Sequence, residues 1–310
     1  MKVLVAGSTG LVGSAVASKF EERGCQVINH NSKITNLLDR KATFEYIAKI
    51  KPDLIIDAAA KVGGIGSNSK HPYEYISENL QIQTNLMDAC LKYKVDKFVF
   101  LGSSCIYPKN SPQPIREEYL LTGKLENTNS AYAIAKIAGI EAIKSAREEY
   151  GLQWISLMPT NVYGPNDNFN LEHAHVLPAL IRRFYEAKKA NYDSVTLWGD
   201  GQAQREFIYS SDLAEAIYFA SVKYNESEPL NIGTGSDLRI IELANLISKC
   251  VGFEGNILWD TSKPNGTPKK LLDISRLKQL GWSPTINLET GISNTYSWFK
   301  KALKDGRARL

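Results

Sequence analysis

The strongest constraint on the fold lies at the start of the chain, where a short apolar stretch runs into a turn with three glycines. Residues 2–6 read KVLVA, glycines follow at positions 7, 10 and 13, and a helical pattern continues to residues 23–24. This order suits close approach of the backbone to a pyrophosphate at a helix N-terminus. The turn could close any βα unit, but its position after the first strand favours nucleotide binding by Gly7, Ser8, Thr9, Gly10, Leu11, Val12 and Gly13.

Strands and helices alternate through the first half of the chain. Further strands are predicted at 26–29, 53–58, 97–101 and 153–158, and helices at 72–93 and 130–150. This alternation predicts an α/β protein with a Rossmann-type, doubly wound parallel sheet, which binds ligands at the carboxyl ends of its strands. Residues 1–165 form the expected nucleotide-binding domain.

After residue 165 the pattern loosens into shorter elements, with glycine turns at 199–201 and 233–235 and a loop at 263–268. We expect residues 166–310 to form a smaller C-terminal α/β domain that binds the substrate. A helix and a strand within 205–235 could return to the first sheet, so the division between the domains is expected to be discontinuous.

Charge and composition exclude several classes of protein. The net charge is +4 with acids and bases interspersed, and no basic run would follow a nucleic-acid backbone. No apolar stretch has the length of a membrane span, and the apolar run at residues 2–6 is too short for the hydrophobic region of a signal peptide. A cytoplasmic protein is therefore expected. The four cysteines form no CxxC pair and His173-Ala-His175 lacks accompanying ligands, so we expect free thiols and no metal.

The end of the second strand carries the signal for cofactor choice. An acid there would hold a ribose 2′-hydroxyl, whereas a base would hold a 2′-phosphate. Residues 29–33 read NHNSK and contain no acid. Lys33 therefore favours NADPH over NADH, unless it is simply a solvated surface lysine.

Tyr132 and Lys136 indicate carbonyl chemistry. Four positions are about one helical turn, so the phenol and the ammonium share a face, and the ammonium favours the phenolate. A serine upstream, in residues 102–105 (GSSC), could hold a carbonyl oxygen. Cys105 hints at a second reaction, because hydride transfer needs no thiol; a lone cysteine would otherwise more often be a core residue.

Four longer strings resemble those of one known family. They are AAKVGGI at 59–65, LGSSCIYP at 101–108, YAIAKIAG at 132–139 and MPTNVYGPNDNF at 158–169. With the glycine turn they resemble the extended short-chain dehydrogenase/reductase superfamily and, within it, the GDP-L-fucose synthases. That resemblance implies a homodimeric, NADPH-dependent oxidoreductase and isomerase, which epimerises C3 and C5 of GDP-4-keto-6-deoxy-D-mannose and reduces its C4 ketone.

The resemblance also implies roles for individual residues. Tyr132 would be the proton donor in reduction, with Lys136 as its partner and Ser103 orienting the ketone. Cys105 would be the base in epimerisation and His175 the acid. Residues implied to contact the sugar nucleotide are Arg183, Trp198, Arg205 and Lys270, and further cofactor contacts are Lys33, Ala58, Ala59, Leu101, Gly102, Lys136, Pro159, Asn161, Val162 and His175.

This chemistry is consistent with the residue types. C3 and C5 both flank the C4 ketone, so one set of donors on its oxygen can stabilise both enolates. Inversion needs a base on one face of the sugar and an acid on the other. The reference pKa values of a thiol, ~8.5, and an imidazole, near 6.5, lie on either side of neutral pH, so cysteine and histidine suit these roles. If strand geometry continues past Leu101, Ser103 points the same way as Cys105, whereas Ser104 points away.

Some alternatives remain open at this point. Nucleotide-sugar dehydratases would carry Asp-Glu where this chain has Cys105-Ile106, but another nucleotide-sugar epimerase or reductase, or a catalytically silent NADP-binding regulator, would share the fold. Arg183 could be solvated, Arg205 could pair with an acid, and Trp198 could be core.

Overall fold

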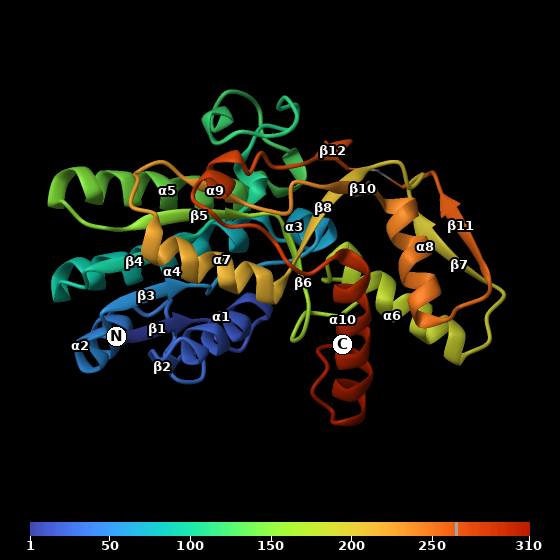
Figure 1. The fold of residues 1–310 in the computed structure, drawn as a ribbon, viewed down its shortest axis with the longest axis horizontal. Coiled ribbons are helices and arrows are strands. Elements are labelled where there is room, and N and C mark those ends of the chain that lie inside the picture. The colour runs from blue at the N-terminus through green and yellow to red at the C-terminus, as the bar shows by residue number, and fades with distance from the viewer. Residues whose placement is uncertain (264–265) are drawn as a thin grey trace.

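A six-stranded parallel sheet forms the centre of the larger lobe in the computed structural model, which describes residues 1–263 and 266–310. Its strand order is β2-β1-β3-β4-β5-β9, and Figure 1 labels the first five of these strands. The first five strands lie within two residues of their predicted ends, which confirms the Rossmann-type fold. The strands are β1 (Lys2–Ala6), β2 (Gln26–Asn29), β3 (Leu54–Asp57), β4 (Lys97–Leu101), β5 (Ile155–Pro159) and β9 (Leu230–Ile232).

Helices cover both faces of this sheet. The β1-to-β2 and β3-to-β4 connections run in opposite directions across the strand order, so right-handed crossovers place α1 (Leu11–Glu22) on one face and α4 (Pro72–Tyr93) on the other. On the first face, α1 packs against α7 (Ser210–Lys223), with ring centroids of Phe20 and Tyr218 5.2 Å apart. On the second, α4 packs against α2 (Arg40–Ile50) and α5 (Ser130–Tyr150).

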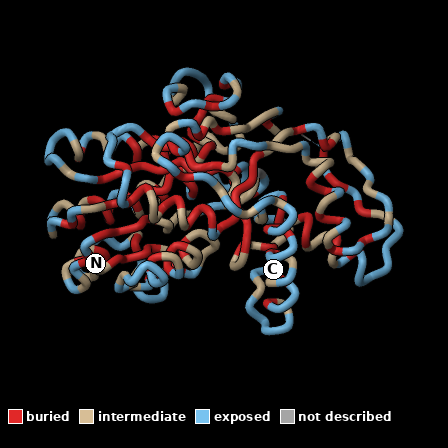
Figure 2. The backbone as a smooth tube through the Cα atoms, viewed as in Figure 1, coloured by how far each residue is buried: buried red, intermediate tan, exposed pale blue. Residues whose placement is uncertain are grey.

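The central strands are apolar because neither of their faces meets water. All residues of β3 and β5 are buried, and Figure 2 shows the buried residues concentrated along the strands of this sheet. The apolar runs that predicted strands are therefore the core of the larger lobe. The acid Asp57, at the end of β3, is buried with them.

A second lobe is built around β8 (Gln204–Tyr209). This strand pairs with β6 (Asn161–Tyr163), β10 (Asp237–Arg239) and β12 (Lys269–Lys270), and β7 (Ser194–Trp198) pairs separately with β11 (Asn256–Asp260). A second apolar cluster lies among α6 (Val176–Lys189), α8 (Ile240–Val251) and α10 (Leu288–Lys304). Within it, the rings of Phe169 and Phe299 stack with centroids 4.3 Å apart.

The chain returns from the second lobe to the first sheet. After β6, β7, β8 and α7, β9 pairs with β5 in parallel, with Leu230 opposite Leu157. The buried carboxylate of Glu206 in β8 ties neighbouring segments together, since it accepts N–H groups from Thr234, Gly235 and Leu272. The remaining short helices are α3 (Ile65–Lys70) and α9 (Ser275–Gln279).

Pro264 and Asn265 of the expected 263–268 loop lie outside the described residues. Of the helices in the described chain, none has the length and apolarity to cross a bilayer.

Candidate active site

The glycine turn between β1 and α1 forms a close-packed cradle. Gly7 has φ +77°, and a Cβ there would lie 2.7 Å from the Ala58 carbonyl oxygen. A Cβ at Gly13 would lie 2.2 Å from the Gly7 carbonyl oxygen. Among the described residues no side chain caps the N-terminus of α1, and its first turn contains no acid, so its N–H groups remain available for an anion. This arrangement fits the pyrophosphate of a dinucleotide.

The end of β2 meets this turn through Ser8. The backbone N–H and hydroxyl of Ser8 both donate to the His30 carbonyl, at 2.9 and 3.1 Å. Burial lowers the pKa of His30, whose Nε2 lies 3.0 Å from the Thr35 carbonyl. Lys33 lies just beyond in an exposed turn. Its ammonium is therefore accessible, and its contact with a 2′-phosphate stays a prediction.

The other predicted cofactor residues line the carboxyl edge of the sheet. Ala58 and Ala59 follow β3, Leu101 ends β4 and Gly102 follows it, and Pro159 ends β5. Asn161 and Val162 open β6, and the Asn161 amide donates to the Glu206 carbonyl at 2.7 Å. The sheet edge thus aligns these segments beside the glycine turn, where a doubly wound sheet binds its ligand.

The backbone changes direction directly after β4. Strand alternation between Ser103 and Cys105 required strand geometry past Leu101; Ser103 is still extended, with φ −162° and ψ 151°, but residues 104–106 form a turn of 3₁₀ helix. Ser103 caps this turn by accepting the Cys105 N–H at 3.2 Å. Ser104 is nevertheless buried, whereas Ser103 and Cys105 are partly exposed. Ser103 and Cys105 are therefore the accessible pair, although the turn rather than strand alternation places them so.

Helix α5 brings Tyr132 and Lys136 to this turn. The Lys136 ammonium is buried, donates to the Leu101 carbonyl at 2.9 Å, and lies 6.0 Å from the centroid of the Tyr132 ring. Burial lowers the pKa of Lys136, and the charge of Asp57 opposes that shift. Burial raises the pKa of Tyr132, and Cys105 raises it further, against the effect of a hydrogen bond with Ser103. The phenol is therefore protonated and can donate a proton to an oxygen held by Ser103.

Two nitrogen atoms lie against the sulfur of Cys105. Asn129 Nδ2 donates to Sγ at 3.3 Å, and Lys270 Nζ lies 3.7 Å from Sγ. The register of β8 and β12 sets Lys270 opposite Arg205. Burial lowers the pKa of Arg205, and the nearby Cys105 and Glu126 oppose that shift. Cys105 thus lies at the edge of a positively charged corner rather than in an apolar core.

His175 stands at the start of α6, on the solvent side of the same corner. Crowding by surrounding protein lowers the pKa of His175, and the Lys270 ammonium lowers it further. Both histidines are exposed, and the His173 backbone carbonyl accepts the Gly64 N–H at 3.0 Å. The choice of His175 over His173 as the acid stays a prediction that rests on the family resemblance.

Trp198 and Arg183 lie further from this centre. Trp198 is 62% exposed at the end of β7, so the alternative that it is a core residue is wrong. Lys263 Nζ lies 5.9 Å from the centroid of its ring. On α6, Arg182 pairs with Glu186 at 2.7 Å, while Arg183 is half-buried. In the described chain no hydrogen bond or ion pair joins Arg183 or Trp198 to the Cys105 corner.

Sequence reasoning missed two polar residues at the site, Asn129 and Asp57. Asn129 immediately precedes α5 and was hidden in a polar loop. Asp57 is 1% exposed, and its Oδ1 accepts the Ala59 N–H at 3.2 Å, whereas its Oδ2 has no hydrogen-bond partner among the described residues. Burial raises the pKa of Asp57 to about 6, and Lys136 limits the rise. The sequence signal that could have identified Asp57 is an acidic residue at the end of an apolar run predicted to be a buried strand.

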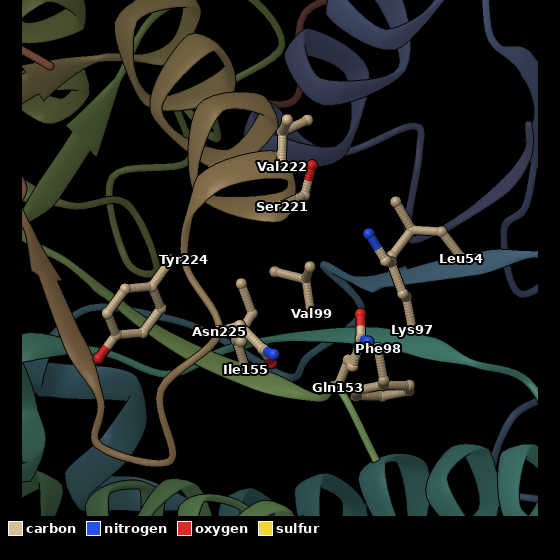
Figure 3. A pocket seen from close by; sticks show the side chains of 10 residues that line it. All are labelled: Leu54, Lys97, Phe98, Val99, Gln153, Ile155, Ser221, Val222, Tyr224 and Asn225. Carbon is tan, nitrogen blue, oxygen red and sulfur yellow. The ribbon is translucent and has the colours of Figure 1, made fainter. Parts of the chain in front are cut away.

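A small cavity of about 50 Å³ lies at the opposite, amino ends of β3, β4 and β5. Figure 3 shows Lys97, Gln153 and Asn225 around it. Small-molecule sites usually enclose about 300–1,000 Å³. The cavity is therefore too small for a nucleotide and is unrelated to the site above.

Comparisons with known proteins agree with this geometry. The model of the NAD dependent epimerase/dehydratase family matches residues 3–233. GDP-L-fucose synthase 1 of Arabidopsis thaliana is 50% identical over 97% of this chain and 93% of its own. GDP-L-fucose synthase of Escherichia coli K12 is 46% identical, with 96% of each chain covered. The structure of a GDP-L-fucose synthetase from Naegleria fowleri bound to NADP superposes with a TM-score of 0.92 at 28% identity, covering 100% of this chain and 96% of that one.

Proposed function

The chain belongs to the NAD dependent epimerase/dehydratase family, and on that basis we propose that it converts GDP-4-keto-6-deoxy-D-mannose into GDP-L-fucose. The reaction inverts C3 and C5 and reduces the C4 ketone with NADPH. The observation that carries this proposal is the position of Cys105, which shares one accessible turn with Ser103 beside Tyr132 and Lys136. A thiol at that position serves proton abstraction next to a ketone, in addition to the reduction of the ketone itself.

The cofactor is NADP, which supplies or accepts the hydride when bound. We assign its pyrophosphate to the N–H groups at the start of α1 and its ribose to Lys136. The fit rests on the absence of any capping side chain on α1 and on the backbone contacts that only glycine permits at positions 7 and 13. Lys33 is assigned to the 2′-phosphate.

Epimerisation needs a base and an acid on opposite faces of the sugar. With the ketone oxygen held by Ser103 and Tyr132, Cys105 Sγ takes the proton from C3 or C5, and the electron pair moves into the enolate. His175 returns a proton to the other face, which breaks its N–H bond and restores the ketone with inverted configuration.

Reduction uses the same oxygen contacts. Tyr132 gives its phenolic proton to the C4 oxygen as that carbon gains hydride, and Ser103 holds the oxygen in place. The buried Lys136 ammonium stabilises the charge left on the phenol. Arg205, Lys270, Arg183 and Trp198 are assigned to the GDP portion of the substrate.

The test is to identify the product. The protein is incubated with GDP-4-keto-6-deoxy-D-mannose and NADPH in deuterated water, and the sugar is analysed by NMR. GDP-L-fucose carrying deuterium at C3 and C5, with stoichiometric loss of NADPH absorbance, is expected. A product with the manno configuration would indicate another nucleotide-sugar reductase, and no reaction would indicate a silent NADP-binding regulator; either result would overturn the proposal.

We also propose that the protein is a cytoplasmic homodimer, as the family resemblance implies. Light scattering of the full chain tests the assembly, because a monomer at micromolar concentration would contradict it. Fractionation of the source cells tests the location.

A further inference from the structure

The contacts around Cys105 go beyond what a positioned thiol needs. Both neighbours of its sulfur are donors, namely the Asn129 amide at 3.3 Å and the Lys270 ammonium at 3.7 Å. An ammonium has only donors, so the sulfur atom must accept in that contact. Two donors at the sulfur favour negative charge on it, the form in which sulfur reacts as a base or nucleophile.

Asn129 is held where it can make this contact. Its backbone N–H donates to the Glu126 carbonyl at 3.2 Å, and it directly precedes the helix that carries Tyr132. Its side-chain Oδ1 has no hydrogen-bond partner in the described parts of the chain. The side chain is therefore engaged through its nitrogen, on the sulfur.

The wider charge distribution points the same way. Arg205 lies opposite Lys270 in the β8–β12 register and interacts favourably with negative charge on Cys105. The nearby acid Glu126 is paired with Lys109 at 2.7 Å, so its charge is partly compensated. Burial raises the pKa of Tyr132, another neighbour of Cys105, so its phenol stays protonated and contributes no charge.

We propose that Asn129 and Lys270 prepare the Cys105 sulfur for proton abstraction: Asn129 is a positioning residue that donates to Sγ, and Lys270 is the cation that compensates negative charge on the sulfur, in addition to any contact with the sugar nucleotide. The proposal deepens the proposed function, on which it rests, because it names the groups that prepare the epimerisation base. Lys270 then couples both halves of epimerisation, since it favours the anionic base and, in the free protein, disfavours the cationic acid His175.

Alkylation of the ligand-free protein tests this without turnover. Iodoacetamide is neutral, so its reaction rate follows the thiolate rather than electrostatic steering. Cys105 modification is followed by peptide mass spectrometry near neutral pH, with the half-buried Cys25 and Cys250 as internal references. Lys270→Met and Asn129→Leu should each slow alkylation of Cys105 by about tenfold, because the thiolate is the nucleophile. Lys270→Arg should restore most of the rate by restoring the charge.

Lys269→Met is the matched control. Lys269 precedes Lys270 on β12 but pairs with Asp237 at 3.3 Å, so this variant should alkylate like the wild type. Circular dichroism confirms folding, and if Asn129→Leu does not fold, Lys270→Met decides. Wild-type alkylation rates in both variants would overturn the proposal. If the wild type made no GDP-L-fucose, the proposed function would be wrong, but slower alkylation in the variants would still support the roles of Asn129 and Lys270. If the wild type made GDP-L-fucose and both variants were alkylated at the wild-type rate, only this inference would be wrong.

Discussion

Lys136 is fixed to the end of strand β4 by a hydrogen bond from its ammonium to the Leu101 carbonyl, at 2.9 Å. Residues 102–105 follow that carbonyl directly, so the lysine of α5 and the turn with Ser103 and Cys105 are held in one frame. The reductive and epimerising groups therefore share a support. A substitution that removes one functional atom should therefore impair reduction or epimerisation selectively, while the other groups keep their positions.

Tyr132→Phe removes the proton donor for reduction. Loss of a positioned acid typically lowers the rate of the chemical step by about 10²–10⁴-fold. We expect a fall of that size in NADPH oxidation, with a smaller fall in deuterium exchange at C3 and C5 because Ser103 still contacts the enolate oxygen. Single-turnover absorbance and NMR measure the two rates. The exposed Tyr150→Phe should match the wild type; equal losses in both rates of Tyr132→Phe would contradict the assignment.

Cys105→Ser should have the converse effect. A serine hydroxyl is a far weaker base, so deuterium incorporation at C3 and C5 should nearly disappear while direct C4 reduction of the unepimerised ketone remains possible. NMR of the product in deuterated water detects both. Cys250→Ser provides the control, since that cysteine packs at the second apolar cluster. Undiminished deuterium uptake in Cys105→Ser would make Cys105 structural.

Lys33→Ala should impair selection of NADPH. The ammonium would pair with the 2′-phosphate, which NADH lacks, so the variant should raise KM for NADPH far more than KM for NADH. Lys41→Ala, on the exposed start of α2, is the control and should change neither constant. Equal changes for both cofactors would remove Lys33 from this role.

Asp57→Asn should make stability less dependent on pH. Burial raises the pKa of Asp57 from 3.8 to about 6, so the folded protein keeps a proton that the unfolded chain releases between these values. Wild-type stability should therefore fall as pH rises through this window, by roughly 3 kcal/mol for a shift of about two units. Asp57→Asn lacks that loss and should become relatively more stable toward neutral pH.

Urea unfolding of both proteins on either side of the window measures this difference. Asp167, whose pKa burial raises to about 7, titrates in both proteins and cancels in the comparison. A stability difference that does not change with pH would show that Asp57 keeps its ordinary pKa. Slower NADPH oxidation in the variant would reflect the lost counter-charge of Lys136.

Gly13→Ala should destabilise the cofactor turn. The new Cβ would meet the Gly7 backbone oxygen at 2.2 Å, and backbone on both sides cannot yield as a flexible side chain would. We expect a loss of about 1–3 kcal/mol in unfolding free energy, together with weaker NADPH binding. Gly66→Ala is the matched control, because Gly66 is also helical and its Cβ would meet only one atom, at 3.9 Å. A Gly13→Ala protein as stable as the wild type would contradict the close packing.

The fold was predictable because its signals are local. The apolar run of β4 and the periodicity of α4 and α5 each depend on residues within one element, so their bounds could be predicted to within two residues. The position of Tyr132 one turn before Lys136 is equally local. By contrast, the strand alternation used to orient Ser103, Ser104 and Cys105 does not apply, because the Ser103 hydroxyl accepts the Cys105 N–H and a 3₁₀ turn begins at Ser104.

The surroundings of Cys105 could not be predicted, because they come from distant parts of the chain. Asn129 is 24 residues from Cys105, and Lys270 is 165 residues away. Lys270 reaches the sulfur only because β12 pairs with β8 in one register. Asp57 was not predicted for another reason. Burying a carboxylate is costly unless a positive charge such as Lys136 lies near it, and the sequence does not show that the two residues are close.

The position of β9 has a consequence for how the protein folds. The strand that covers the edge of β5 ends at residue 232, after the chain has passed through most of the second lobe. During synthesis one edge of β5 therefore stays unpaired until about seventy further residues have been added. Long-range parallel strand pairing of this kind also forms slowly. A fragment ending at residue 165 would expose that edge permanently and should aggregate, so the two lobes are expected to unfold in a single cooperative transition.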